Sequence, residues 1–314
     1  MVNIKQQRGV ALLTVILIVT LISITAISMR AHQELDIRRT VNELNHAQAV
    51  VYLQGAEYLS KTVLKEDAKK SKIDTLDEDW AMVLPPFPVD GGTIGGILED
   101  LSGKFNINNL VDAKGKKSIA DHRSFQVLLV NLKLDADIAD AVVDWIDKNE
   151  TPEPGGAEDG YYLGKDKQPY RAANQLIAST TELLRVKGIN FKVFNKIKNF
   201  ITALPKRNSI NINTADKEVL RMISISISDA DAQDMVKTRK KNGYKKVSDL
   251  LSHSSLSSLN AEAKGKLIKL DVKSDYFLLT STAIIGQLEI RMKSILNRND
   301  KKKVTVLVRS QGEL

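Results

Sequence analysis

Residues 147–162 read DKNETPEPGGAEDGYY and hold the densest group of polar side chains in the chain. Carboxylates stand in this stretch at Asp147, Glu150, Glu153, Glu158 and Asp159. Calcium binds six to eight oxygen ligands, often from one flexible loop that also supplies neutral oxygens. The spacing is not that of an EF-hand. By residue type alone, a solvated acidic loop is the simpler interpretation, and a calcium site is the alternative.

Sequence patterns of catalytic sites are missing. The 314 residues include four histidines and no cysteine, which excludes zinc–thiolate sites and cysteine nucleophiles. Neither an HExxH nor a Gly-x-Ser-x-Gly sequence occurs. The sequence therefore predicts a protein that is not an enzyme.

The chain is basic, with a formal charge of +8 at pH 7. Such an excess is compatible with binding to nucleic acid or to anionic lipid. The lysines are spread over several short clusters, however, the densest being in residues 237–246. Charge runs of this kind are usually solvated surface, and we expect that for most of them.

The elements that must position the acidic loop begin with the N-terminus. Residues 9–29 carry no charged side chain, and a helix of about 21 residues spans ~30 Å, the thickness of a bilayer's hydrocarbon core. Lys5 and Arg8 precede it, so the head should stay cytoplasmic and the remainder should cross the membrane. Residues 31–66 continue with a helical stripe of apolar side chains and no proline. One helix over residues 10–67 is predicted, with its first part in lipid.

The sequence around Arg8, Gly9 and Val10, followed by ALLT and a long helix, resembles the type IV pilin signal. The resemblance implies that a prepilin peptidase cuts between Gly9 and Val10 and that Val10 becomes N-methylated. Most members of that family have Glu at the fifth mature position, which here is Thr14. A carboxylate in lipid is costly unless it is paired. Thr14 either marks a subunit with no partner above it, at the filament tip, or is a polar residue tolerated through bonds to its own backbone.

Motifs downstream extend the resemblance over nearly the whole chain. They are DWID at 144–147, PEPGGAED at 152–159, PYRAANQ at 169–175 and ININTA at 210–215. Together they resemble the minor pseudopilin general secretion pathway protein K of type II secretion. The resemblance implies that the acidic loop binds calcium, and we assign Asp147, Glu150, Glu158 and Asp159 as ligands. Asn149 stands where the family usually has another acid. Asp140 and Asp144 are expected to be plain solvated residues.

The stretch from Ile212 to Leu251 supports a rival hypothesis, because it is similar to helix-hairpin-helix modules of DNA-uptake proteins. Those modules grip phosphate through a Gly-x-Gly hairpin whose backbone N–H groups approach the oxygens closely. Here the hairpin reads ISISIS at 223–228, without glycine. The basic side chains of this stretch could still attract phosphate groups nonspecifically; they are Lys237, Arg239, Lys240, Lys241, Lys245 and Lys246. We expect a packing unit, and nucleic acid is not an expected partner.

The order of elements predicts an α+β fold with an insertion. Proline and glycine density at 68–92 predicts a linker. Strands are expected at 93–98, 104–110, 276–283, 288–296 and 304–309, and helices at 119–133, 135–148, 171–177, 180–186, 191–201, 217–222, 229–242 and 247–251. Since two isolated strands are only marginally stable, both strand groups should share one antiparallel sheet against the long helix.

The predicted organisation has a prepilin leader at 1–9 and a transmembrane helix at 10–29. A discontinuous pilin-like body follows at 30–110 and 272–314. An inserted, mostly α-helical domain at 111–271 consists of two units, 111–205 and 210–270, with similarity to SAM and helix-hairpin-helix modules.

The resemblance implies a minor pseudopilin at the pseudopilus tip, which starts pseudopilus assembly and supports export of folded proteins. It implies an inner-membrane anchor, a periplasmic body, and the minor pseudopilins I, J and H as partners, besides the prepilin peptidase and membrane lipid. Secreted proteins are further candidate partners. The alternatives are a minor pilin that primes a type IV pilus and a DNA-binding protein of an uptake apparatus.

Overall fold

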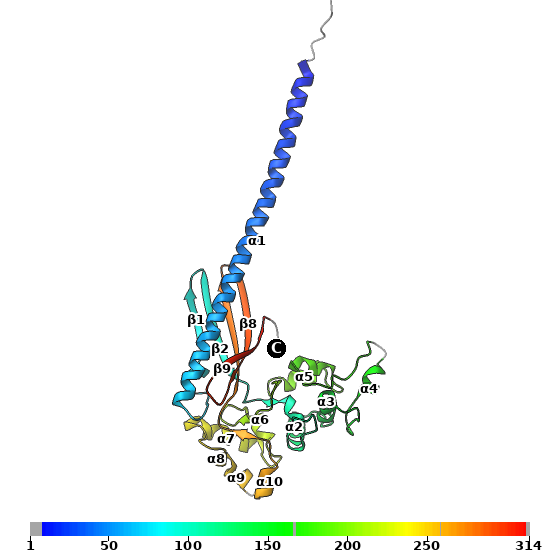
Figure 1. The fold of residues 1–314 in the computed structure, drawn as a ribbon, viewed down its shortest axis with the longest axis vertical. Helices are drawn as coiled ribbons and strands as arrows, with labels where there is room; N and C mark the ends of the chain where they lie inside the picture. Colours follow the sequence, from blue (N-terminus) through cyan, green and yellow to red (C-terminus); the bar gives the residue numbers. More distant parts are fainter. Residues whose placement is uncertain (1–7, 166–167, 258, 312–314) are drawn as a thin grey trace, which may run out of the picture.

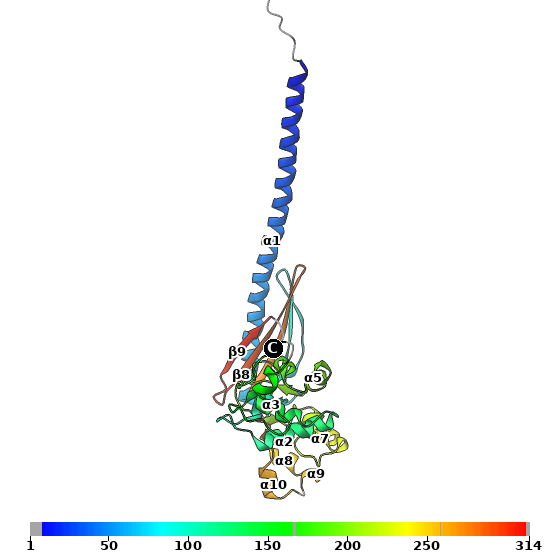
Figure 2. The same ribbon diagram turned by 90° about the vertical axis from the view of Figure 1, so that its right-hand side faces the viewer.

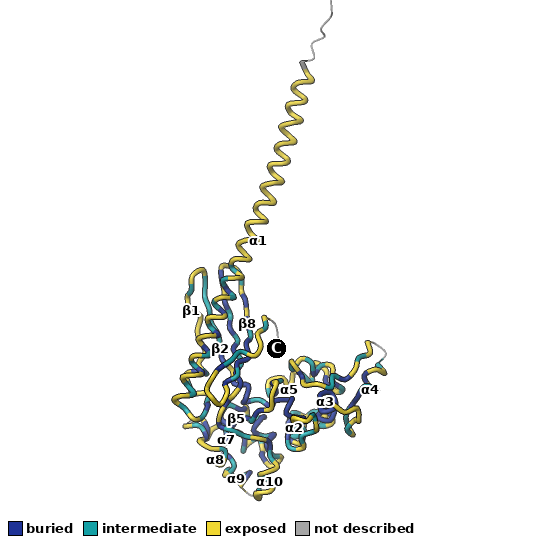
Figure 3. Tube along the Cα trace, viewed as in Figure 1, coloured by how far each residue is buried: buried dark blue, intermediate teal, exposed yellow. Residues whose placement is uncertain are grey.

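One long helix dominates the shape of the molecule. The computed structural model describes residues 8–165, 168–257 and 259–311. Helix α1, Arg8–Lys70, runs unbroken for 63 residues and projects far beyond the remaining fold (Figure 1). The absence of proline and the open space around Gly55 allow this length. An 18-residue window near its N-terminus has a mean hydropathy of 2.8, apolar enough to cross a membrane. The first half of α1 is exposed along its described length and stands apart from the rest of the described fold (Figure 3).

The second half of α1 packs on a five-stranded antiparallel sheet in the order β1-β2-β7-β8-β9. The strands are β1 Leu84–Val89, β2 Gly92–Asp100, β7 Tyr276–Ile285, β8 Leu288–Arg298 and β9 Val304–Ser310. Ala49, Leu53 and Leu64 of α1 are fully buried against the apolar face of the sheet. Because β2 pairs with β7 along its whole length, segments more than 170 residues apart in sequence form the centre of the sheet.

Two local predictions in this region are wrong. The proline-rich segment expected as a linker contains strand β1, whose prolines lie at the free edge where no ladder hydrogen bond is needed. The strand expected at 104–110 is only β3, Phe105–Asn106, followed by the 3-10 helix η2, Ile107–Leu110. β3 pairs in parallel with β4, Ile201–Thr202, outside the main sheet. Its apolar side chains are buried in the helical part of the chain.

The helical part is held together by one apolar core. Its helices are α2 Ile119–Asn131, α3 Ile138–Ile146, α4 Asp159–Leu163, η3 Thr180–Arg185, α5 Phe191–Ile197, α6 Lys217–Arg221, α7 Asp229–Asn242, α8 Val247–Leu251, α9 Ser254–Ser257 and α10 Ala261–Gly265. A short parallel pair joins β5, Ile210–Asn211, to β6, Leu270–Asp271. The buried cluster runs continuously from Phe105 to Val272 and so includes both units. The helix expected at 171–177 is absent, because this segment is irregular.

A buried polar joint connects the helical part to the sheet. The Asp100 carboxylate, at the end of β2, accepts hydrogen bonds from the hydroxyls of Ser274 and Thr214, both at 2.5 Å, and from the N–H of Ser102 at 2.7 Å. Asn211 Nδ2 donates to the Ser274 hydroxyl at 2.7 Å. Two views at right angles show the helices below the sheet, at the end farthest from the N-terminus of α1 (Figure 2). The joint lies where the chain leaves and re-enters the sheet.

Candidate metal centre and N-terminal segment

The residues of the expected processing site lie at the start of α1. Gly9 and Val10 are helical and exposed. The remaining leader residues, 1–7, lie outside the described residues. The Thr14 hydroxyl donates to the carbonyl oxygens of Ala11 at 2.9 Å and Val10 at 3.2 Å. Bonds of this kind satisfy a hydroxyl inside an apolar helix without any partner from another chain.

Asp147 directly follows α3, so that the helix fixes the position of this first residue of the acidic loop. It is buried, and its Oδ2 accepts a hydrogen bond from Asn149 Nδ2 at 2.6 Å. Its Oδ1 is buried without a partner in the described part of the chain. Burial, and then the nearby Asp144 carboxylate, raise the pKa of Asp147 to about 6. The ionised form of Asp147 therefore destabilises the fold unless a positive charge lies close to it.

Glu158 occupies the N-cap position of α4 and is also buried. Both of its carboxylate oxygens lack a partner among the described residues. Burial raises its pKa to about 7, and the carboxylates of Asp144 and Asp147 add to this effect. Orphaned oxygens of this kind are rare in folded proteins, because an unpaired buried acceptor destabilises the fold. Carboxylate oxygens of this kind suit a hard cation such as calcium.

Asp144 and Asp140 are not solvated, which corrects the expectation for both. Asp144 is fully buried, and its Oδ1 accepts from the Glu153 N–H at 3.1 Å. A Cβ on Gly156 would lie only 1.8 Å from Asp144 Oδ2, so this close approach needs glycine. Asp140 instead accepts from Lys117 Nζ at 2.9 Å and lies 2.7 Å from His122 Nε2. The irregular loop is thus held to α3 through Asp144 and also through Asp140, whose Oδ2 accepts from the Gly155 N–H at 3.3 Å and which shares Lys117 with Glu153.

The other two assigned ligands lie at the rim of the loop. Glu150 is exposed. Asp159 accepts from the Ala172 N–H at 2.9 Å and lies 3.4 Å from Arg171. The structure therefore separates a buried pair, Asp147 and Glu158, from these two more accessible carboxylates.

Asn174 is a further candidate ligand that the sequence reasoning missed. Its backbone has a φ of 45°, and its N–H donates to the Trp145 carbonyl at 3.0 Å. Its Oδ1 is buried and unpartnered within the described ranges. A neutral oxygen of this kind suits a calcium shell. The available signal was the motif PYRAANQ itself, in which Asn174 has the side chain that tolerates a left-handed conformation.

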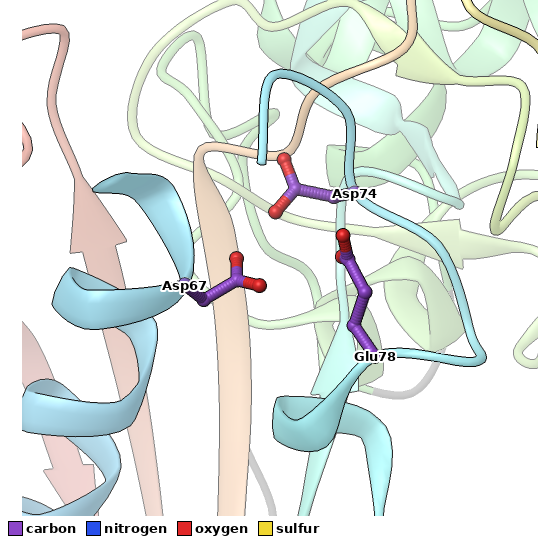
Figure 4. A group of neighbouring side chains, drawn as sticks. All are labelled: Asp67, Asp74 and Glu78. Atoms are coloured by element: carbon purple, nitrogen blue, oxygen red, sulfur yellow. The ribbon is translucent and has the colours of Figure 1, made fainter. Parts of the chain in front are cut away.

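A second acidic cluster, Asp67, Asp74 and Glu78, has ligand atoms within 4.8 Å of one another (Figure 4). Among the residues that the structure describes, this is the one such close trio, and the loop carboxylates are farther apart. Arg298 lies against it, 3.1 Å from Asp67 Oδ2 and in contact with Asp74. Burial, and then Glu78 and Asp74, raise the pKa of Asp67 to about 6. This cluster is an ion-pair network that ties α1 to β8, because Arg298 already supplies the positive charge.

The helix-hairpin-helix-like stretch lacks the geometry that grips phosphate. Ile225 projects from the hairpin at residues 223–228 and is 76% exposed. Arg239 is buried and donates to the carbonyl oxygens of Ile212, at 2.9 Å, and Ala215. Because these backbone carbonyl oxygens occupy its guanidinium, Arg239 is not available to bind a nucleic acid.

The fold defines the class of protein as a membrane-anchored, pilin-like subunit with a helical insertion. Two family models, both described as type II secretion system (T2SS), protein K, match residues 103–206 and 210–272. The chain is 32% identical over 321 residues to the type II secretion system protein K of Pseudomonas aeruginosa, covering 98% of this chain and 94% of that protein. Identity to protein K of Aeromonas hydrophila is also 32%, over 98% of both chains. This chain belongs to the type II secretion system protein K family.

A solved structure agrees with this assignment. A chain in the crystal structure of the GspK–GspI–GspJ complex from the enterotoxigenic Escherichia coli type 2 secretion system superposes on this protein with a TM-score of 0.78. The sequence identity is 28%, and the superposition covers 88% of this chain and all of the other. The predicted fold class, a long helix on an antiparallel sheet with a helical insertion, is confirmed.

Proposed function

We propose that this protein is the minor pseudopilin at the tip of a type II secretion pseudopilus, where it starts assembly and supports export of folded proteins. The observation that carries this proposal is the superposition of 88% of this chain on a chain of the GspK–GspI–GspJ complex. The role is structural and not catalytic. A bulky helical part at the end of a slender anchor is hard to repeat along a thin filament, which favours a terminal position (Figure 1).

The N-terminal segment would be processed before it is used. A prepilin peptidase would cut between Gly9 and Val10 on the cytoplasmic side of the inner membrane, and Val10 would then be N-methylated. The helix would stay in lipid with the body in the periplasm. Thr14 forms hydrogen bonds only within its own helix in the structure, and a mature subunit without Glu there needs no amine partner above it. It would still offer its own amine to the subunit below.

Calcium is part of the proposal for the acidic loop. The buried, unpartnered oxygens of Asp147, Glu158 and Asn174 fit a hard cation, with Asp144 beside them and Glu150 and Asp159 at the rim. Bound calcium would supply the positive charge that these carboxylates lack. The chain's own contribution is to hold the oxygens in place, with Asp147 at the C-terminal end of α3 and Glu158 at the N-terminal end of α4.

The partner test is co-purification. The proposal expects the full chain, co-expressed with the I-like and J-like pseudopilins of its own system, to co-purify with both, and expects H as an additional member. In the cell, deletion of its gene should abolish secretion of exported proteins, and a plasmid copy should restore it. Unaffected secretion after deletion would contradict the proposed function.

A further inference from the structure

The ammonium of Lys187 is bound to the turn at the centre of the acidic loop. Its Nζ donates to the carbonyl oxygen of Gly156 at 2.9 Å and to that of Gly155 at 3.2 Å. It also lies 5.5 Å from the centre of the Tyr161 ring. Hydrogen bonds from a charged donor are about twice as strong as those between neutral groups. A residue 31 positions further along the chain than Gly156 therefore holds this turn from outside the loop.

The backbone that carries Lys187 is itself fixed. The segment connects η3 to α5, and the apolar side chains on either side of Lys187 are buried in the core of the helical part. The Lys187 N–H donates to the hydroxyl of Tyr162, on α4, at 3.2 Å. Gly188 has a φ of 81°, and a Cβ there would lie 3.1 Å from the side chain of Ile138, the first residue of α3. Lys187 thus lies in a segment that packs against both helices whose ends carry the buried candidate ligands.

The turn that Lys187 holds determines how two carboxylates approach each other. The Gly156 N–H donates to the Glu153 carbonyl at 2.9 Å, which closes the turn. Gly156 lies directly against the Asp144 carboxylate. Glu158, whose two carboxylate oxygens lack a partner among the described residues, follows two positions later. A shift of Gly156 would therefore alter the position of Glu158 relative to Asp144.

The Lys187 ammonium acts on the backbone of the loop, and its contribution is to geometry. Burial raises the pKa of Glu158 to about 7, and the charged groups that add to this effect are the acidic side chains of Asp144, Asp147, Asp159 and Glu150. The ammonium is directed instead at the two carbonyl oxygens of the turn. Lys187 therefore shapes the loop without balancing the charge of Glu158.

We propose that Lys187 is a positioning residue for calcium binding by the acidic loop, because it holds the Gly155–Gly156 turn in the conformation that places Glu158 near Asp144. This inference rests on the calcium proposal above and adds to it a residue from outside the loop. Loss of a group that orients metal ligands typically lowers metal affinity by about 10- to 100-fold. Lys187 acts by reducing the conformational freedom that the loop would otherwise lose when it binds an ion.

The test is isothermal titration of calcium into the full chain, purified in detergent and freed of bound metal beforehand. Lys187→Met keeps a straight side chain of similar length, so the variant should fold, but it removes the charge and the N–H donors. Lys187→Arg keeps both and is the conservative variant. The matched control is Lys196→Met on α5. The Lys196 ammonium also donates to a backbone carbonyl, that of Leu132 at the end of α2, at 3.3 Å.

The expected result is that Lys187→Met weakens calcium binding by roughly tenfold or more. Lys187→Arg should restore most of the affinity, and Lys196→Met should bind calcium like the unsubstituted chain. The thermal unfolding midpoint in chelator measures how far each substitution destabilises the fold without the ion. A lower midpoint for Lys187→Met with unchanged calcium affinity would overturn the proposal, because Lys187 would then support only the fold. Tighter calcium binding by Lys187→Met would also overturn it, because the ammonium would then act by repelling the ion.

Failure of this inference can be distinguished from failure of the calcium proposal. If the unsubstituted chain binds calcium and Lys187→Met binds it equally well, the positioning role is overturned and the calcium proposal stands. If the unsubstituted chain binds no calcium, the calcium proposal is contradicted, and the positioning role with it.

Discussion

Two buried carboxylates have the most unusual environment of any residues in the acidic loop. Asp147 and Glu158 are withdrawn from water next to Asp144, yet three of their four oxygens have no partner in the described chain. Their raised pKa values follow from burial first and from the nearby Asp144 carboxylate second. A divalent cation would relieve both effects together. The stability of the protein with and without calcium therefore tests whether these carboxylates bind the ion.

Removal of calcium should lower the thermal unfolding midpoint at pH 8, because the chelator leaves the carboxylates ionised and unpaired. In chelator, stability should also fall as the pH rises from about 4.5 to about 7. In that window folded Glu158, with a pKa raised to about 7, binds more protons than the unfolded chain with its ordinary value of 4.5. Differential scanning fluorimetry with and without chelator, at pH 5 and pH 8, measures both effects.

The matched variant is Glu158→Gln, which should flatten this pH dependence and weaken the response to calcium. Glu153→Gln is the control, since Glu153 pairs with Lys117 at 3.0 Å. An identical midpoint with and without chelator at pH 8 would remove calcium from the proposal.

Thr14 permits a second prediction at this scale. Within the described residues its hydroxyl bonds to the backbone of its own helix, so Thr14→Ala should leave secretion unchanged in a complementation assay. Thr14→Glu should reduce the amount of inserted protein, because an unpaired carboxylate in a membrane helix costs about 2.5–3.5 kcal/mol. Loss of secretion in the alanine variant would mean that the hydroxyl meets another subunit.

At the scale of elements, apolar packing and buried polar groups act together. α1 and the sheet share apolar clusters and the pair of buried Glu57 with Arg309, and the helical part has its own continuous core. Between the helical part and the sheet lie a small apolar cluster and Asp100, whose pKa burial raises to about 6 even though four donors face it. A fully satisfied buried network fixes one arrangement of the elements, and a partly satisfied one is costly.

Asp100→Ala should therefore lower the free energy of unfolding by about 2 kcal/mol or more, because the donors of Ser274, Thr214 and Asn211 lose their common acceptor. Denaturant unfolding of the full chain in detergent measures this difference. Asp77→Ala, which removes an exposed carboxylate, is the control and should change stability by less than about 0.5 kcal/mol. Similar midpoints for both variants would show that the joint is not stabilising.

At the scale of the whole molecule, the chain crosses from the body into the helical part and returns to the strand next to the one it left. Because Asp100 pairs with Phe277, the two crossings lie side by side. The helical part is thus an insertion in a hairpin, with a core separate from that of the sheet. Such an arrangement lets each part bury its own apolar surface.

Replacing residues 102–275 with Asn-Gly should then leave a body that still folds, because this turn joins adjacent antiparallel strands. The expected observation is a cooperative thermal transition by circular dichroism, with both helix and strand signals. Replacing residues 102–285 in the same way is the control. It removes β7 from the centre of the sheet and should abolish the transition. A non-cooperative melt for the first variant would contradict an independently folding body.

Local patterns in the sequence were sufficient to predict several features of the fold. An uncharged run of apolar residues with no proline determines a continuous membrane helix, since no other structure satisfies its backbone in lipid. Alternation and β-branched residues located the strands after residue 275, and periodicity located α2, α3 and α7. The density of carboxylates in residues 147–162 was enough to mark a candidate site, although not its ligands.

Other features depended on contacts between distant residues. The prolines of β1 predicted a linker, because the edge position that tolerates them depends on how the strands pair in the sheet. Asp144 was predicted to be a surface residue, because its burial depends on the close approach of Gly156, which is distant in local sequence patterns. The PYRAANQ motif includes Asn174 but does not indicate that its side-chain oxygen is buried. Pairing between segments far apart in the chain, and burial that several elements create together, are properties of the tertiary structure, since no short window of sequence contains both partners.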